Sequence, residues 1–220
     1  MSTRIRKPTK AAAARAPALN LRKQASQERS RATVDALIEA TARVLVREGF
    51  ERASTNRIAA EAGVSIGSLY QYFPTKESLV ASVIERHKSE MLGILRDALA
   101  RVAQRPVGEA MREIVDVMIR AHRVDPQLHR VLVEQIPRTG RLAEVEGFER
   151  EANELVRAFL EAHRSELRRA LDLELATFVC VSTVETLAHG AVLHQPQLLA
   201  DDRVESFIDE VTRLVLQYLT

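Results

Sequence analysis

The sequence has few of the residues that build disulfide frameworks, membrane spans or aromatic-rich sheets. Its one cysteine, Cys180, allows no disulfide within the chain, so we expect a reducing, cytoplasmic compartment and a buried structural thiol. We expect no membrane partner, because no stretch approaches the roughly 20 apolar residues of a span. Trp is absent and aromatic residues make up only 4% of the chain, whereas Ala, Leu, Val, Glu and Arg dominate. This mixture favours helices over sheets.

Sequence motifs for catalysis and metal binding are missing as well. The chain has no G-x-S-x-G, no glycine-rich phosphate loop, no H-E-x-x-H and no Cys/His cluster with zinc spacing. We therefore expect no enzyme activity, no cofactor and no metal. Two histidines in predicted helices, His122 and His189, are interpreted as ordinary satisfied or exposed side chains, with cavity lining as the alternative. The histidines are scattered along the chain: His87, His122, His129, His163, His189 and His194.

Charge is unevenly distributed between the two parts of the chain. Residues 1–31 hold nine basic residues and one acidic residue, a net charge of +8, whereas the remainder carries −6. A basic, Ala-rich segment of this kind cannot bury a core, so residues 1–28 are predicted to form a flexible arm. We favour a polyanion-seeking role for the arm, because each Lys or Arg near a phosphate releases a counterion. A solvated extension without a role and an organelle transit peptide are the alternatives.

A helix, a tight turn and a second helix are predicted after the arm. Apolar residues recur at three- and four-residue steps from about Arg31 to Glu48, which indicates an amphipathic helix that Gly49 ends in a left-handed conformation. A short helix then runs to Ala62, and Gly63 ends it with the positive φ of a tight turn. The next short helix is capped by a serine and carries mostly small side chains on its outer face. These are Ser65, Ile66, Gly67 and Ser68, followed by Tyr70.

This arrangement suits the major groove of DNA. Small side chains let a helix backbone approach the edges of the bases. Tyr72 and Lys76 flank the break at Pro74, where a hydroxyl, an ammonium and a helix N-terminus together suit a phosphate, and Thr55 lies at a second helix N-terminus. Helix-glycine-helix corners also occur in proteins with no DNA role, so the corner alone does not decide the function.

The stretch from about Arg31 to His87 resembles the DNA-binding domain of the TetR family. The resemblance rests on Gly49-Phe50, on the run from Ile58 to Ser65, and on the signature Leu-Tyr-x-Tyr-Phe-x-x-Lys-Glu-x-Leu that ends at Leu79. Ile66 departs from the polar or basic residue of many relatives and suggests an apolar contact, as with a thymine methyl. The DNA contacts implied by the resemblance are Thr55, Arg57, Ser65, Ile66, Gly67, Ser68, Tyr70, Tyr72 and Lys76.

Everything after the short helices is predicted to be helical. A long helix begins after Thr75 and ends before Arg105-Pro106, and further helices are predicted at about 107–122, 127–135, 144–168, 173–193 and 202–219. The fold class is therefore all-α with about nine helices. A three-helix DNA-binding head at 29–76 precedes a larger helical body at 77–220. The last two helices are the most apolar, and from pattern alone they fit either a dimer interface or a monomeric core.

Taken with the resemblance, these features predict a bacterial transcriptional repressor. The resemblance implies a homodimer formed through 173–193 and 202–219, a palindromic double-stranded operator, and an unknown small-molecule effector held in the body. The apolar composition of the body suggests an apolar effector. The alternative is an adaptor or nucleoid-type protein that uses the basic arm to bind DNA without regard to its sequence.

Overall fold

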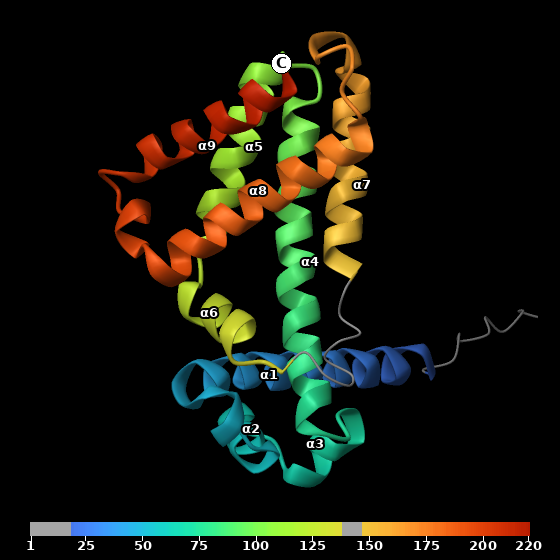
Figure 1. Ribbon diagram of the computed structural model, residues 1–220. Coiled ribbons are helices and arrows are strands. Elements are labelled where there is room, and N and C mark those ends of the chain that lie inside the picture. The colour runs from blue at the N-terminus through green and yellow to red at the C-terminus, as the bar shows by residue number, and fades with distance from the viewer. Residues whose placement is uncertain (1–18, 138–146) are drawn as a thin grey trace, which may run out of the picture.

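The computed structural model of the protein describes residues 19–137 and 147–220. Within these ranges it consists of nine α-helices without a strand, which confirms the predicted fold class (Figure 1). The helices are α1 (Leu19–Arg52), α2 (Thr55–Ala62), α3 (Ile66–Tyr72), α4 (Lys76–Val102), α5 (Val107–His122), α6 (Pro126–Glu134), α7 (Gly147–Ala162), α8 (Leu173–His194) and α9 (Val204–Leu219). Short 3-10 segments, Arg164–Glu166 and Pro196–Leu199, follow α7 and α8.

The first helix starts earlier than its apolar pattern predicts. α1 begins at Leu19 rather than near Arg31, so the last part of the predicted basic arm is helical, while residues 1–18 lie outside the described residues. Ala, Arg, Lys and Gln have high intrinsic helix propensity, which allows a helix to extend beyond its buried face. Gly49 has φ 78° and ψ 167°, a conformation open to glycine, and it kinks the chain before α1 ends at Arg52.

The head core forms where α1, α2 and α3 pack against the start of α4. α2 and α3 lie below α1 in Figure 1, at one end of the molecule. Side chains from each element fill the space between them, and the fully buried members are Leu37, Ala40, Val44, Leu45, Ile58, Leu69, Leu79 and Val80. The core continues along α4 as far as the partly buried Ile84. The domain boundary that we expected at residue 76 stays a prediction, and the packing of the head extends past it.

The body core lies around the remaining length of α4, which crosses the molecule from the head to the far end of the body (Figure 1). From Met91 onward α4 packs against α5 and α7, and apolar side chains of α8 and α9 complete the same core. The fully buried members are Val102, Ala110, Val115, Ile119, Leu160, Ala176, Ala188, Ile208 and Leu219. One continuous helix therefore belongs to both hydrophobic cores.

α6 lies between the head and the body. It packs against α1 on one side and against α8 on the other, as Figure 1 also shows. Leu128 and Val131 of α6, together with Ile136 just after it, are buried in the head core. The side chain of Gln135 accepts a hydrogen bond from the backbone N–H of Phe50 at 3.4 Å. A segment that the sequence assigns to the body is therefore built into the head.

α8 corrects the expectation that no stretch of the chain approaches the apolar length of a membrane span. By length and composition it is apolar enough to cross a membrane, with a mean hydropathy of 1.4 over an 18-residue window of which 39% is buried. One side of the helix packs in the body core through Ala176, Cys180 and Ala188. Burial raises the pKa of the Cys180 thiol to about 12, so this side chain is a protonated, structural thiol.

The backbone at Gly49 leads to a stability prediction. Replacing Gly49 with Ala adds a Cβ to a residue whose φ is 78°, and this Cβ would lie 2.7 Å from Oε1 of Gln135. We expect the free energy of unfolding to fall by about 1–3 kcal/mol in urea denaturation, because an L side chain is strained there. Gly93→Ala is the control, since it lies within α4 with nothing within 4 Å of the new Cβ, and it should raise stability by about 0.5–1 kcal/mol. The same sign of change in both variants would contradict this account.

Candidate DNA-binding surface

Side-chain caps fix the two short helices of the head. The hydroxyl of Ser54 accepts from the backbone N–H of Arg57 at the start of α2. Gly63 ends α2 in the left-handed conformation, at φ 68° and ψ 26°, and the backbone N–H of Val64 then donates to the carbonyl of Ala59 at 3.0 Å. Ser65 caps α3 by accepting from the N–H of Ser68 at 3.0 Å. These bonds set how α3 projects from the head.

The break between α3 and α4 is fixed in the same way. Phe73 is buried and ends α3, and its N–H donates to the carbonyl of Leu69 at 2.9 Å. Thr75 and Ser78 form a capping box, in which each hydroxyl accepts from the backbone N–H of the other residue. The predicted start of the long helix after Thr75 is confirmed. α4 therefore starts at a defined angle to α3.

The outer face of α3 is open to solvent. Of its larger side chains, Ile66 is 38% exposed, Tyr70 52% and Tyr72 36%. Ser65 and Gly67 are also exposed, while Ser68 is half-buried. This face lies on the outside of the head, as a DNA-reading helix requires. The hydroxyls of Ser65 and Ser68 are 2.8 Å apart, so one donates to the other.

A hydrogen bond joins the predicted contacts of α2 and α3. The hydroxyl oxygens of Thr55 and Tyr70 are 3.1 Å apart at the surface. The structure thus brings two residues that are 15 positions apart in the chain into one patch. A hydroxyl pair at a helix N-terminus is well suited to the phosphate oxygens of a duplex.

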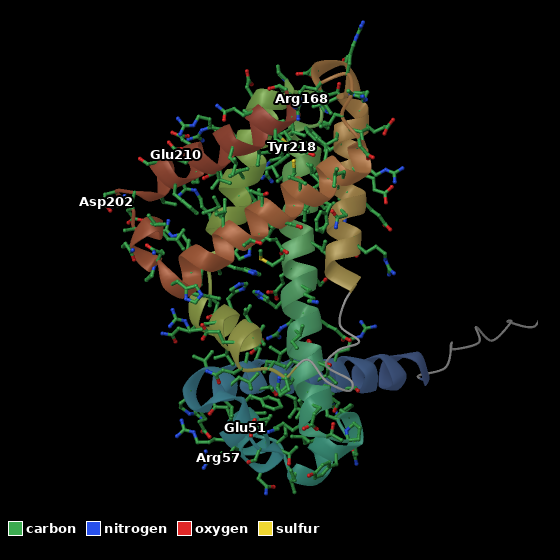
Figure 2. The ribbon with its side chains drawn as sticks, in the orientation of Figure 1. Glu51, Arg57, Arg168, Asp202, Glu210 and Tyr218 are labelled. Atoms are coloured by element: carbon green, nitrogen blue, oxygen red, sulfur yellow. The ribbon has the colours of Figure 1, made fainter. Side chains whose placement is uncertain are left out.

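Arg57 lies at the outer edge of the head (Figure 2) and forms an ion pair with Glu48 of α1. Glu61 of α2 likewise pairs with Arg43 and Arg47, at 2.9 and 3.0 Å. The hydrogen bond from Arg57 holds the pKa of Glu48 below its usual range, and that from Arg43 does the same for Glu61. The carboxylates therefore stay charged at neutral pH and compete with DNA phosphates for these guanidinium groups.

Lys76 is directed toward the end of α1. Its ammonium donates to the carbonyl oxygen of Phe50 at 3.0 Å and lies 4.1 Å from the centre of the Phe50 ring. Both contacts tie the start of α4 to the end of α1. The side chain of Lys76 is half-buried. Its observed contacts are with Phe50 of the head, and the phosphate contact expected for Lys76 stays a prediction.

A small apolar cavity with a volume of about 40 Å³ lies in the body. Side chains of α4, α5, α7 and α8 line it, and Met118, Cys180 and Glu185 are among them. Sequence reasoning did not locate this cavity. Effector pockets usually measure roughly 300–1,000 Å³, so an organic ligand needs the lining helices to move apart.

Comparison with known families decides the identity of the fold. A model described as "Bacterial regulatory proteins, tetR family" matches residues 37–83. A second, "Tetracyclin repressor-like, C-terminal domain", matches residues 106–219, more than half of the chain. The chain belongs to the TetR family. It is thus a DNA-binding regulator of transcription, in agreement with the helix-turn-helix head and helical body seen here.

Two proteins that resemble this TetR-family chain are distant from it in sequence. The nucleoid occlusion factor SlmA of Actinobacillus pleuropneumoniae is 27% identical over 116 residues, 53% of this chain and 55% of the relative. The chain thus spans about half the length of the curated relatives it matches. The fatty acid degradation regulator FadR of Bacillus halodurans is similar in fold, with a TM-score of 0.64, 22% identity, and coverage of 83% of this chain and 97% of that one.

A ligand complex is also among the proteins with this fold. SmeT, the repressor of the multidrug efflux pump SmeDEF of Stenotrophomonas maltophilia, has been solved with triclosan. That complex aligns with a TM-score of 0.66 and 20% identity over 86% of this chain and 92% of the other. At this identity the likeness shows the TetR fold alone.

The ion pair at the edge of the head leads to a prediction about this TetR-family regulator. Glu48→Gln removes the acid that pairs with Arg57 and also with Arg47, which Glu61 still holds, so the affinity for any duplex should rise about 2- to 5-fold in fluorescence anisotropy. Glu51→Gln is the matched control, because it removes the same charge from an exposed position nearby (Figure 2) without releasing Arg57. Equal gains from the two variants would show that net charge, and not release of Arg57, is responsible.

Proposed function

We propose that the protein is a cytoplasmic repressor that binds a palindromic operator as a homodimer and is released by a small-molecule effector. The observation that carries the proposal is the exposed outer face of α3, with Ile66, Tyr70 and Tyr72 open to solvent on a short helix capped at its start. Small residues between them allow close approach to base edges. In a dimer, two such helices about 35 Å apart would enter successive major grooves.

Within this proposal the nine predicted residues divide by chemistry. Ser65, Ile66, Gly67 and Ser68 meet base edges, with Ile66 reaching an apolar group such as a thymine methyl. Phosphates are bound by the hydroxyls of Thr55, Tyr70 and Tyr72 and by Arg57 once it exchanges Glu48 for DNA. Lys76 adds positive potential while it holds α4 to the end of α1.

Exposed apolar side chains support the proposed dimer interface. Leu175 and Phe178 of α8 are 56% and 59% exposed, and Leu214 of α9 is 51% exposed. Apolar side chains of this size gathered on two neighbouring helices mark a surface that a partner covers. A second copy of the same chain, related by a two-fold axis, places this surface against itself.

The effector is proposed to bind in the body at the apolar cavity. Apolar residues of α5, α7 and α8 form most of its wall, which favours a largely apolar ligand. Because α4 borders the cavity at Leu95 and also carries the head, separation of the lining helices would change the spacing of the two heads. The ligand then lowers operator affinity by its preference for the widened state.

Selection of bound duplexes from a random pool tests the proposed function. We expect a palindrome whose half-sites are centred about 10 base pairs apart or a multiple of this. Arg57→Ala should weaken all duplexes alike and reduce the salt slope of log K by about 1, whereas Ser68→Arg should change the selected sequence. If both variants act equally on operator and random DNA, α3 does not read sequence.

The proposed interface makes a separate prediction. Phe178→Asp places a charge in the apolar surface, so sedimentation should show a monomer at concentrations where the wild type is a dimer. Val124→Asp is the control, because Val124 is 81% exposed on the turn between α5 and α6. A dimer that persists in Phe178→Asp would place the interface elsewhere.

The likeness to SlmA gives a nucleoid-type role a specific basis as the second candidate. That relative bears the name nucleoid occlusion factor and matches over 53% of this chain. If the protein binds DNA without regard to sequence, random duplex should displace the selected operator as well as unlabelled operator does. A large excess of random duplex that fails to compete favours the repressor.

A further inference from the structure

Four histidines that lie far apart in the sequence meet where the head joins the body. His87 of α4, His122 of α5, His129 of α6 and His189 of α8 form one cluster. The ring centre of His129 lies 4.9 Å from that of His122, 4.5 Å from that of His189 and 5.5 Å from that of His87. The nearest ring nitrogens of His122, His129 and His189 all lie within 4.8 Å of one another.

The hydrogen bonds of the cluster leave nitrogen lone pairs inside it. Nδ1 of His122 is 2.7 Å from the carbonyl oxygen of Met118, so Nδ1 carries the proton and Nε2 presents a lone pair. His129 is 95% buried, and its Nε2 has no hydrogen-bond partner. An orphaned buried nitrogen is costly unless a ligand satisfies it.

We propose that His122, His129 and His189 bind a divalent transition-metal ion of the zinc type. Three imidazoles with a fourth position left open is a common set for such ions, and nitrogen donors exclude Mg²⁺ and Ca²⁺, which require oxygen. Burial lowers the pKa of His122, and burial with three neighbouring rings lowers the pKa of His129 to about 3. A neutral imidazole is the form that binds a metal.

His87 acts as a positioning residue in this site. Its Nε2 is 3.2 Å from Nδ1 of His129. When Nε2 of His129 binds the metal, Nδ1 carries the proton and donates a hydrogen bond to Nε2 of His87. Metal-binding histidines usually have such a partner, which fixes the ring and its tautomer.

Metal binding would draw three helices together and reach the head, an inference that rests on the proposed function. Nitrogens around a tetrahedral ion lie about 3.4 Å apart, whereas the ring nitrogens of the three histidines lie within 4.8 Å of one another. α6 is already held to α8, because Arg130 donates to the carbonyl of Leu193 at 3.1 Å. The opposite face of α6 buries Leu128 and Val131 in the head core, so a shift of His129 is transmitted to α1.

The first experiment measures metal binding without DNA. Metal-depleted full-length protein is titrated with CoCl₂, and the visible absorption of bound Co²⁺ is followed before ZnCl₂ is added. We expect about one ion per chain, a band typical of tetrahedral nitrogen coordination, and displacement of Co²⁺ by Zn²⁺ but not by MgCl₂. The absence of this band would overturn the proposed site.

Variants assign the ion to the cluster. His189→Gln, at the half-buried position, and His129→Leu should each weaken Co²⁺ binding at least 100-fold. His87→Phe should weaken it about 10- to 100-fold, as for loss of a positioning partner. His194→Gln, at an exposed position on the same helix as His189, is the control. Circular dichroism verifies that each variant folds, and unchanged binding in folded His189→Gln would place the ion elsewhere.

The last experiment tests coupling to DNA. The dissociation constant for the selected operator should change about 5-fold or more when Zn²⁺ is added to the wild type, and should not change in His189→Gln. A change below 2-fold in zinc-loaded wild type overturns the coupling and leaves the metal site standing. If neither metal-free nor zinc-loaded wild type binds any duplex, the proposed repressor function fails, whereas the Co²⁺ titration still decides the site.

Discussion

The packing of α4 into two hydrophobic cores is the constraint on which the rest of the structure depends. Its first turns are held in the head by Leu79, Val80 and Val83, and from Met91 onward it lies in the body. A helix is stiff along its axis, because each turn is hydrogen-bonded to the next. The orientation of α3 is fixed relative to α4 by the buried Phe73 and the Thr75 capping box. The reading face therefore cannot be re-aimed without moving α4 or its neighbours.

α6 provides a second connection between the body and the head. α4 spans both cores along its length, whereas α6 presses on α1 through Leu128 and Val131 and contacts α8 through Arg130. The apolar cavity borders α4, and the histidine cluster includes both α4 and α6. Each of these sites is therefore one packing layer from an element of the head, so a ligand at either site would act on the head through directly packed helices.

Most helix boundaries could be predicted from the sequence because local residues set them. Gly63 ends α2, Thr75 caps α4, and Asp125 with Pro126 starts α6, each through backbone chemistry within one turn. The early start of α1 was missed, since a polar Ala-rich helix shows no apolar period. The position of Lys76 over Phe50 and the meeting of four histidines were also missed. Those contacts join residues 26 and 42 positions apart, and no local pattern encodes them.

Hydroxyl-radical footprinting of the selected operator tests the central claim most directly. If the exposed face of α3 reads DNA from a two-fold dimer, protection will fall on one side of the duplex in two patches centred about 10 base pairs apart or a multiple of this. The wild type should give both patches, and in Tyr72→Ala both should be lost together. A single continuous footprint, or one that Tyr72→Ala leaves intact, would contradict the account.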